Sequence, residues 1–208
     1  MIYDGMIFYE PSKRDRSVLP HDPFKSLVAP RPIGWISTMD SRDRVNLAPY
    51  SFFNAVGERP HMLAFSSHGA KDSSTFAGEL REFVWNLVTW DLREEMNETS
   101  APLPRGASEF SRAGLEMAPS RLVAPPRVAA SPCAMECRVV HHLELRDLDG
   151  NTFDQHLVIG QVVGIHLDER AIAGEEIDTA GLRPIARCGG PADYTVVERI
   201  FRMTRPSS

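Results

Sequence analysis

RPIGWISTMDSRDRVNLAPYSFFN, residues 31–54, is the stretch that decides the fold. Apolar residues on either side of a polar centre predict two strands, over 32–38 and 45–53, joined by a turn. Pro49 lies inside the second strand. Because proline has no N–H to donate to a neighbouring strand, it predicts a sheet edge, a bulge or a break there. Such a position leaves main-chain groups free for a ligand, and a flat heteroaromatic molecule with a polar rim is the expected partner.

The rest of the chain also favours strands over helices. Further runs rich in Val, Ile, Phe and Trp predict strands over 61–67, 82–88, 134–145 and 155–167. Residues 147–151 (DLDGN) between the last two predict a hairpin turn. Because no long helices separate the strands, a parallel sheet is not expected. We expect a mainly β fold, an antiparallel barrel or sandwich with a few short helices.

The expected helices are short, and we predict them over 73–80, 92–98 and 108–113. Asp72 is expected to cap the first. Asp91 and Glu94 resemble a capping box ahead of the second. Gly114 follows the third and is expected to end it in the left-handed conformation that glycine adopts readily.

Size and charge limit the class of protein. With 208 residues we expect one domain, and 42% apolar and 25% charged residues are ordinary for a globular protein. A net charge of -5 argues against non-specific binding to nucleic acid, which depends on a basic surface. No apolar run approaches the roughly 20 residues of a membrane helix. The N-terminus lacks the apolar core of a signal peptide, so we expect a cytoplasmic protein.

The chain has three cysteines, too few to suggest a disulfide framework. Cys133 and Cys137 are four residues apart on a predicted strand, so they share one face. They form either a metal or redox pair or two small apolar side chains in a sheet. No second ligand pair follows at the spacing of zinc sites, which favours the second interpretation, and we expect no metal centre.

A second polar cluster, SSHGAKDSS, spans residues 66–74. A strand end, a glycine turn, a lysine and a helix start could form a phosphate cradle, or only a capped helix after a surface turn. The spacing of a P-loop and that of a Rossmann glycine motif are both absent. A third cluster, RPIARCGGPADY, spans 183–194. There Arg187 could bind an anion or a carbonyl oxygen, or the segment could be a turn before a last strand.

Taken together, these clusters resemble the flavin reductase-like family, whose fold is the FMN-binding split barrel. The resemblance covers about residues 20–204. It rests on 31–38, 46–54, 71–73, Glu82 and Phe83 with Asn86, Glu109 and Phe110 with 113–115, and 187–194. Ser73 stands where the family often has threonine, Cys188 where a bulky apolar residue is common, and the turn over 42–44 lacks a frequent glycine.

The resemblance implies an antiparallel Greek-key split barrel, usually a homodimer with FMN near the subunit interface. It implies that Trp35, Ser37 and Thr38 line the flavin and that Ala48, Pro49, Tyr50 and Ser51 meet the edge of its ring. It implies that Ser67, Lys71, Asp72 and Ser73 hold the ribityl chain and phosphate, and that Arg187 also contributes. It names no catalytic side chain, because the flavin supplies the chemistry.

The expected activity is that of an FMN-dependent oxidoreductase, a flavin reductase that transfers a hydride from NAD(P)H to flavin N5. Such an enzyme can pass reduced flavin to a partner monooxygenase. Two alternatives stay open. One is an enzyme that keeps its FMN and reduces or oxygenates a small substrate or metal complex. The other is a non-catalytic flavin-binding electron carrier.

Overall fold

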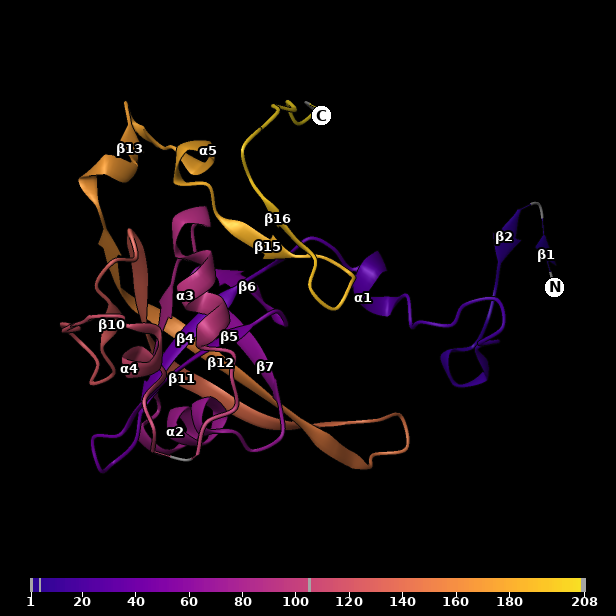
Figure 1. Cartoon of the computed structure of the whole chain (residues 1–208), viewed down its shortest axis with the longest axis horizontal. Helices are drawn as coiled ribbons and strands as arrows, with labels where there is room; N and C mark the ends of the chain where they lie inside the picture. The colour runs from indigo at the N-terminus through magenta and orange to yellow at the C-terminus, as the bar shows by residue number, and fades with distance from the viewer. Residues whose placement is uncertain (1, 4, 105, 207–208) are drawn as a thin grey trace.

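The centre of the fold is one antiparallel sheet of seven strands with short helices packed against it (Figure 1). The computed structural model describes residues 2–3, 5–104 and 106–206. The order of neighbouring strands is β5-β4-β8-β11-β12-β7-β6, and every adjacent pair is antiparallel. The strands are β4 (Gly34–Met39), β5 (Val45–Tyr50), β6 (Phe53–Glu58), β7 (His61–His68), β8 (Glu82–Asn86), β11 (Cys133–Arg146) and β12 (Thr152–Leu167). The mainly β, antiparallel fold class predicted from the sequence is confirmed.

The sheet curls into a barrel. β5 and β6 are consecutive in the chain, yet they occupy its two opposite ends. Only Ser51 and Phe52 lie between Tyr50 and Phe53, and three Cα-to-Cα steps span at most about 11 Å. The two edges must therefore come close together, which a flat seven-stranded sheet could not achieve. The amide of Ser66 donates to the carbonyl of Phe52 at 2.8 Å at this crossing.

The first hairpin differs from its prediction in extent. A bend at Ser51 divides the predicted strand 45–53 into β5 and the start of β6. Pro49 pairs with Trp35 inside β5, and β5 is an edge strand. Of the three alternatives that the proline predicts, the sheet edge is the correct one. In the turn, Asp43 has a φ of 59°, a conformation that Asp tolerates better than most residues other than glycine.

Three short helices lie close to the sheet: α2 (Asp72–Leu80), α3 (Arg93–Glu98) and α4 (Glu109–Ala113). Their predicted positions are confirmed, and Gly114 ends α4 with a φ of 66°. Two predicted caps are wrong. Lys71 rather than Asp72 is the N-cap of α2. The short 3-10 turn η2 (Trp90–Leu92) takes up Asp91, so α3 begins after Leu92 without a side-chain cap.

β4 separates two apolar clusters. Its neighbouring residues Trp35 and Ile36 point to opposite faces, as consecutive residues of a strand must. Trp35 packs with Met96 of α3 and Phe110 of α4. Ile36 packs with Phe83 in a cluster that α2 also contacts. Because both faces of β4 are covered, its side chains have almost no exposed surface, and the polar Ser37 and Thr38 are buried with its apolar residues.

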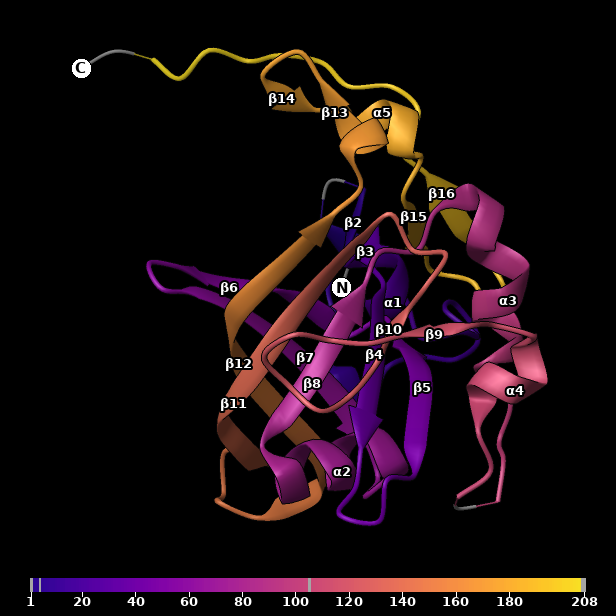
Figure 2. The same cartoon turned by 90° about the vertical axis from the view of Figure 1, so that its left-hand side faces the viewer.

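The segment between α4 and β11, residues 114–132, covers the outside of β8 and β11 (Figure 2). We call it the crossover. It carries the short strands β9 (Met117–Ala118) and β10 (Arg127–Val128). Beyond the barrel, β3 (Arg31–Pro32), β15 (Ile185–Arg187) and β16 (Tyr194–Val196) form a small sheet in the order β16-β15-β3. Before it come η3 (Glu169–Ala171), β13 (Ile172–Ala173), β14 (Glu176–Ile177) and α5 (Thr179–Leu182).

The N-terminal segment projects away from the barrel, to the right in Figure 1. It contains β1 (Ile2–Tyr3), β2 (Met6–Ile7), the 3-10 turn η1 (Pro11–Lys13) and α1 (Phe24–Leu27). Large apolar side chains along it are exposed, including Phe8 at 81% and Leu27 at 77%. Within the described residues, no helix has the length and apolar character needed to cross a bilayer.

Candidate functional site

A cavity of about 440 Å³ lies between the outer edge of β5 and the start of α2, with α4 and the segment after α3 as its other walls. The sequence-predicted residues that line it are Ala48, Pro49, Tyr50, Lys71, Asp72 and Ser73. The cavity therefore brings together residues from two predicted clusters that are some twenty positions apart in the chain. Its size falls within the range of pockets that hold small molecules and cofactors.

The outer edge of β5 offers carbonyl oxygens rather than amides. The Leu47 amide points away from β4 and donates to Glu109 Oε2 at 3.0 Å. Alternate residues of an edge strand face the same way, so the backbone of Pro49 also faces outward, and proline has no N–H. The sequence predicted free N–H and C=O groups here. The outward N–H at 47 is occupied and that at 49 is absent, which leaves carbonyls for a ligand.

A chain of polar side chains links β5 to the start of α2 and the end of β7. Asn46 Nδ2 donates to Ser73 Oγ at 2.7 Å. The Tyr50 hydroxyl makes hydrogen bonds with Ser73 and Ser67, and Ser67 Oγ donates to the carbonyl of Gly69 at 3.3 Å. Burial raises the pKa of Tyr50 and outweighs these hydrogen bonds. The tyrosine is thus a neutral donor over the physiological pH range.

The cavity has a cationic group beside a helix start. Lys71 is the N-cap of α2, and its carbonyl accepts from the amide of Thr75 at 2.9 Å. The first amides of a helix have no partner within it, and the helix dipole favours negative charge there. Asp72 occupies the first helical position and already places one carboxylate near these amides. An anionic ligand at this end would thus rely on Lys71 to offset the charge of Asp72.

Glu109 is a second acidic residue of the cavity, and it is only 7% exposed. Burial raises its pKa, and the bond from the Leu47 amide only partly offsets this. The nearby charge of Asp72 raises the pKa further. Because a raised pKa means that a carboxyl is more often protonated, Glu109 opposes an anionic ligand less than an exposed glutamate would.

The predicted residues of β4 lie behind the cavity rather than on its wall. Trp35, Ser37 and Thr38 are completely buried. Trp35 Nε1 donates to Thr99 Oγ1 at 2.9 Å, and Ser37 Oγ donates to the carbonyl of Pro126 at 2.5 Å. Thr38 Oγ1 is buried without a hydrogen-bond partner. None of these three side chains lines the cavity, and their contact with a flavin stays a prediction.

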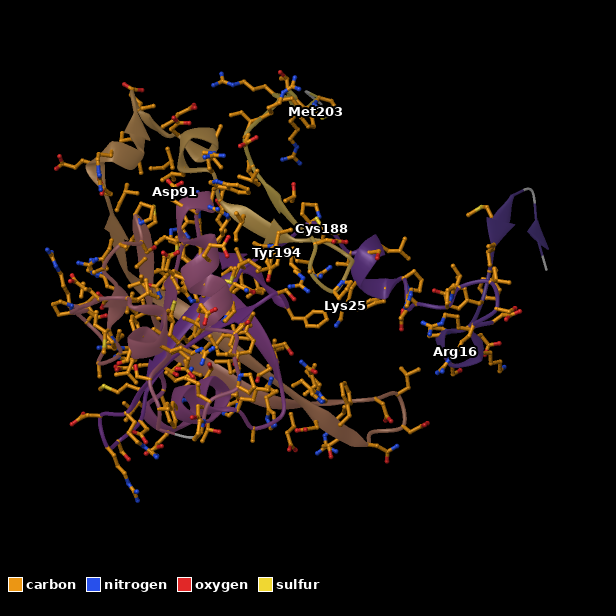
Figure 3. All side chains as sticks on the ribbon, in the orientation of Figure 1. Arg16, Lys25, Asp91, Cys188, Tyr194 and Met203 are labelled. Atoms are coloured by element: carbon orange, nitrogen blue, oxygen red, sulfur yellow. The ribbon has the colours of Figure 1, made fainter. Side chains whose placement is uncertain are left out.

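Arg187 lines a different cavity, of about 550 Å³, together with Tyr194 and residues of α3. Its guanidinium lies 4.6 Å from the centre of the Tyr194 ring and donates to the Tyr194 hydroxyl at 2.7 Å. Figure 3 shows Tyr194 near Cys188 on the C-terminal segment. Ser51, at the bend after β5, and Ser67, on β7, are not among the residues that line the first cavity.

Several residues of the first cavity were not predicted as binding residues: Asn46, Thr99, Ser100, Ala101, Pro102, Leu103 and Glu109. Asn46 and Glu109 belong to motifs that carry the family resemblance, so that resemblance could have suggested them. Residues 99–103 follow α3 and carry no motif. Only the packing of α3 and α4 against β5 brings this segment to the cavity.

The chain belongs to a known family. Residues 27–178 match the family described as flavin reductase like domain. An uncharacterized protein of Deinococcus radiodurans is 37% identical over 190 residues, covering 86% of this chain and 81% of the relative. The uncharacterized protein YwrF of Bacillus subtilis is 34% identical, covering 86% of this chain and 90% of the relative. The family predicted from the sequence motifs is confirmed.

Solved structures agree with this assignment. Nitrilotriacetate monooxygenase component B from Bacillus cereus has a TM-score of 0.87 and 27% identity, covering 97% of this chain and all of that one. The 2-nitrobenzoate 2-nitroreductase NbaA of Pseudomonas fluorescens has a TM-score of 0.82 and 26% identity, covering 96% of each chain. A putative flavin reductase with a split barrel domain from Shewanella frigidimarina has a TM-score of 0.82 at 21% identity, covering 97% and 100%. This last likeness supports the split-barrel fold.

Proposed function

We propose that the protein is an FMN-dependent oxidoreductase that acts as an NAD(P)H:flavin reductase. The observation that carries the proposal is the cavity in which the edge of β5 meets Lys71 and the start of α2. FMN has a doubly negative phosphate at one end and a flat ring with polar edges at the other. The cavity has matching parts: a cation with helix amides, and apolar Ala48, Pro49 and Leu103.

In this proposal, Lys71 and the first amides of α2 bind the phosphate, with the hydroxyl of Ser73 beside them. Tyr50 and the outward carbonyls of β5 face the ring edge. A carbonyl accepts a hydrogen bond, so it suits the ring N–H, whereas the protonated Tyr50 hydroxyl is able to donate to a ring carbonyl. The Asn46–Ser73–Tyr50 chain fixes the relative positions of the two ends.

When bound, FMN supplies the acceptance of a hydride from NAD(P)H, so the chain itself needs no catalytic acid or base. The side chains around the cavity bind the cofactor, orient it and exclude water from one of its faces. Two similar structures are those of a monooxygenase component and a nitroreductase. They support the two roles that the sequence left open, delivery of reduced flavin to a monooxygenase and direct reduction of a small substrate.

We propose that the chain works as a homodimer. The exposed apolar side chains of the N-terminal segment support this, since such a surface gains stability when a second copy covers it.

The three cysteines are all unpaired, which accords with the reducing environment of the cytoplasm. Residues 1–208 are proposed to form a single domain, because the C-terminal segment beyond the family match packs against it: β15 pairs with β3, and Ile185 and Val196 join the core cluster of Trp35.

Anaerobic stopped-flow mixing tests the activity. The protein loaded with FMN is mixed with NADH or with NADPH while the absorbance of oxidised flavin is followed. The proposal predicts fast bleaching with at least one nucleotide, well above the rate of free FMN. Bleaching no faster than that of free FMN with both nucleotides would contradict the reductase and favour a carrier. A second mixing step with oxygen or a nitroaromatic acid then separates the flavin-delivering role from the substrate-reducing one.

A further inference from the structure

A second polar cavity, of about 590 Å³, lies on the other side of the barrel, between the crossover and the ends of β11 and β12. It shares no lining residue with the candidate flavin cavity. Arg121, Arg127 and His166 lie on its wall, together with Glu136 and Asp168. Figure 2 shows the crossover running over β8 and β11 at this place.

The acidic side chains of this cavity are already engaged. Glu136 is fully buried, and its Oε1 accepts from the Arg121 amide at 2.8 Å and from His166 Nε2 at 2.5 Å. Its Oε2 accepts from the amides of Leu122 and Val123 at 2.6 and 3.1 Å. Burial alone would raise the pKa of Glu136, but these hydrogen bonds outweigh it and lower the pKa. The carboxylate is therefore ionised and satisfied, and it fixes the crossover to β11.

Asp168 is engaged in the same way. Its carboxylate forms an ion pair with Arg170 at 2.5 Å. The side-chain hydrogen bond from Arg170 is the main cause that lowers the pKa of Asp168 to about 2. Neither carboxylate is thus available to the two arginines of the cavity.

Arg121 and Arg127 form no ion pair within the part of the chain that the structure describes. Arg127 Nε is also buried without a hydrogen-bond partner. A buried cationic N–H that has lost water and gained no acceptor is costly. The surplus of positive charge and the unsatisfied donor both favour the binding of an anion at this wall.

The same cavity has an apolar side. Leu122 of the crossover lines it and is 48% exposed, so apolar surface faces the open space. Pro132 adds to this side. An inorganic ion would leave that surface in contact with water, whereas a ligand with an apolar body would cover it.

We propose that this cavity binds a small organic anion, with a carboxylate or phosphate group against Arg121 and Arg127 and an apolar or aromatic body against Leu122 and Pro132. The guanidinium fork matches the planar carboxylate or two phosphate oxygens. Because the cavity is separate from the candidate flavin cavity, the proposal does not depend on FMN binding.

Calorimetric titration of flavin-free protein with benzoate, phenyl phosphate, acetate and inorganic phosphate tests the site. The proposal predicts that benzoate or phenyl phosphate binds more tightly than acetate and inorganic phosphate do, since only the first two carry an apolar body. The tighter of the two identifies the anionic group. Equal binding of the aromatic and the small anions, or no binding at millimolar concentration, would overturn the proposal.

Variants then localise the binding. Arg127→Gln is expected to weaken the aromatic anion at least about tenfold, because a charge-assisted hydrogen bond is worth that factor or more. The matched control Arg42→Gln removes the same charge from the exposed turn after β4 and should leave affinity unchanged. If Arg127→Gln fails to fold, Arg121→Gln and Leu122→Ser test the two sides of the cavity separately. Wild-type affinity in both would refute the assignment, whatever the FMN titration shows.

Discussion

The two strands of the first hairpin have different environments, although both were predicted to line the same ligand. β4 is covered on both faces, and its residues Trp35, Ser37 and Thr38 have no exposed surface. β5 is the edge of the sheet, and Ala48, Pro49 and Tyr50 line a cavity. A ligand reaches side chains only where a strand has an open edge or face. One motif can therefore combine a buried structural strand with a strand that lines a cavity.

The largest expected effect is on β4. Trp35→Ala should lower the free energy of unfolding by about 3–5 kcal/mol, because it leaves a cavity in the cluster that holds α3 and α4. Urea unfolding measures this. The half-exposed Trp90 gives the matched control Trp90→Ala, for which a much smaller loss is expected. If Trp35→Ala kept wild-type stability and instead abolished FMN binding, β4 would be a binding strand after all.

The next effect is on the candidate site itself. Lys71→Ala should weaken FMN binding about 10- to 100-fold, since it removes a charge-assisted partner of the phosphate. Riboflavin, which has no phosphate, should bind equally to both proteins. Fluorescence titration measures both ligands. Lys25→Ala on α1, a residue that does not line the candidate cavity, serves as the control. Equal losses for FMN and riboflavin would refute the role of Lys71.

A smaller effect concerns pH. Burial raises the pKa of Glu109 in the folded protein, so the folded state binds its proton more tightly than the unfolded chain does. The free energy of unfolding therefore falls as pH rises from the unfolded pKa, about 4.3, through the higher folded value. Glu109→Gln removes this loss. Its free energy of unfolding, minus that of the wild type, should therefore be larger at pH 7 than at pH 4.

Urea unfolding of wild type and Glu109→Gln at the two pH values checks this prediction. Glutamine keeps an oxygen that can accept from the Leu47 amide, so the comparison isolates the titration. The exposed Glu144→Gln is the control. The same difference from wild type at both pH values would contradict the buried, shifted carboxyl.

The smallest effect is expected at Arg187. Its cavity shares no lining residue with the cavity of Lys71, so Arg187→Gln should change the FMN dissociation constant by less than about threefold within one chain. The same titration measures it. A loss as large as that of Lys71→Ala would mean that Arg187 reaches a flavin through the proposed homodimer, and it would restore the role that the family resemblance implies.

Much of the fold could be predicted from the sequence, because strand-forming runs, turn residues and Pro49 act locally. The extent of the hairpin was wrong, since nothing in residues 45–53 announces that Ser51 bends the chain from one sheet edge to the other. The caps at Asp72 and Asp91 were also wrong. A capping residue depends on where the helix starts within one position, and tertiary contacts decide that.

The candidate site was predictable where it rests on adjacent residues. Ala48, Pro49 and Tyr50, and likewise Lys71, Asp72 and Ser73, occur in runs, and the barrel brings the two runs to one cavity. The sequence could not tell that β4 would be buried behind β5, or that residues 99–103 would form a wall. Both depend on helices α3 and α4 packing over Trp35, a contact between distant parts of the chain.

The difference in affinity between FMN and riboflavin for the wild-type protein tests the assignment of this cavity most directly. We predict that the purified chain binds FMN with quenching of its fluorescence, and at least tenfold more tightly than riboflavin, because Lys71 and the start of α2 hold the phosphate. Equal affinity for the two flavins, or no quenching with either, would contradict the assignment of this cavity.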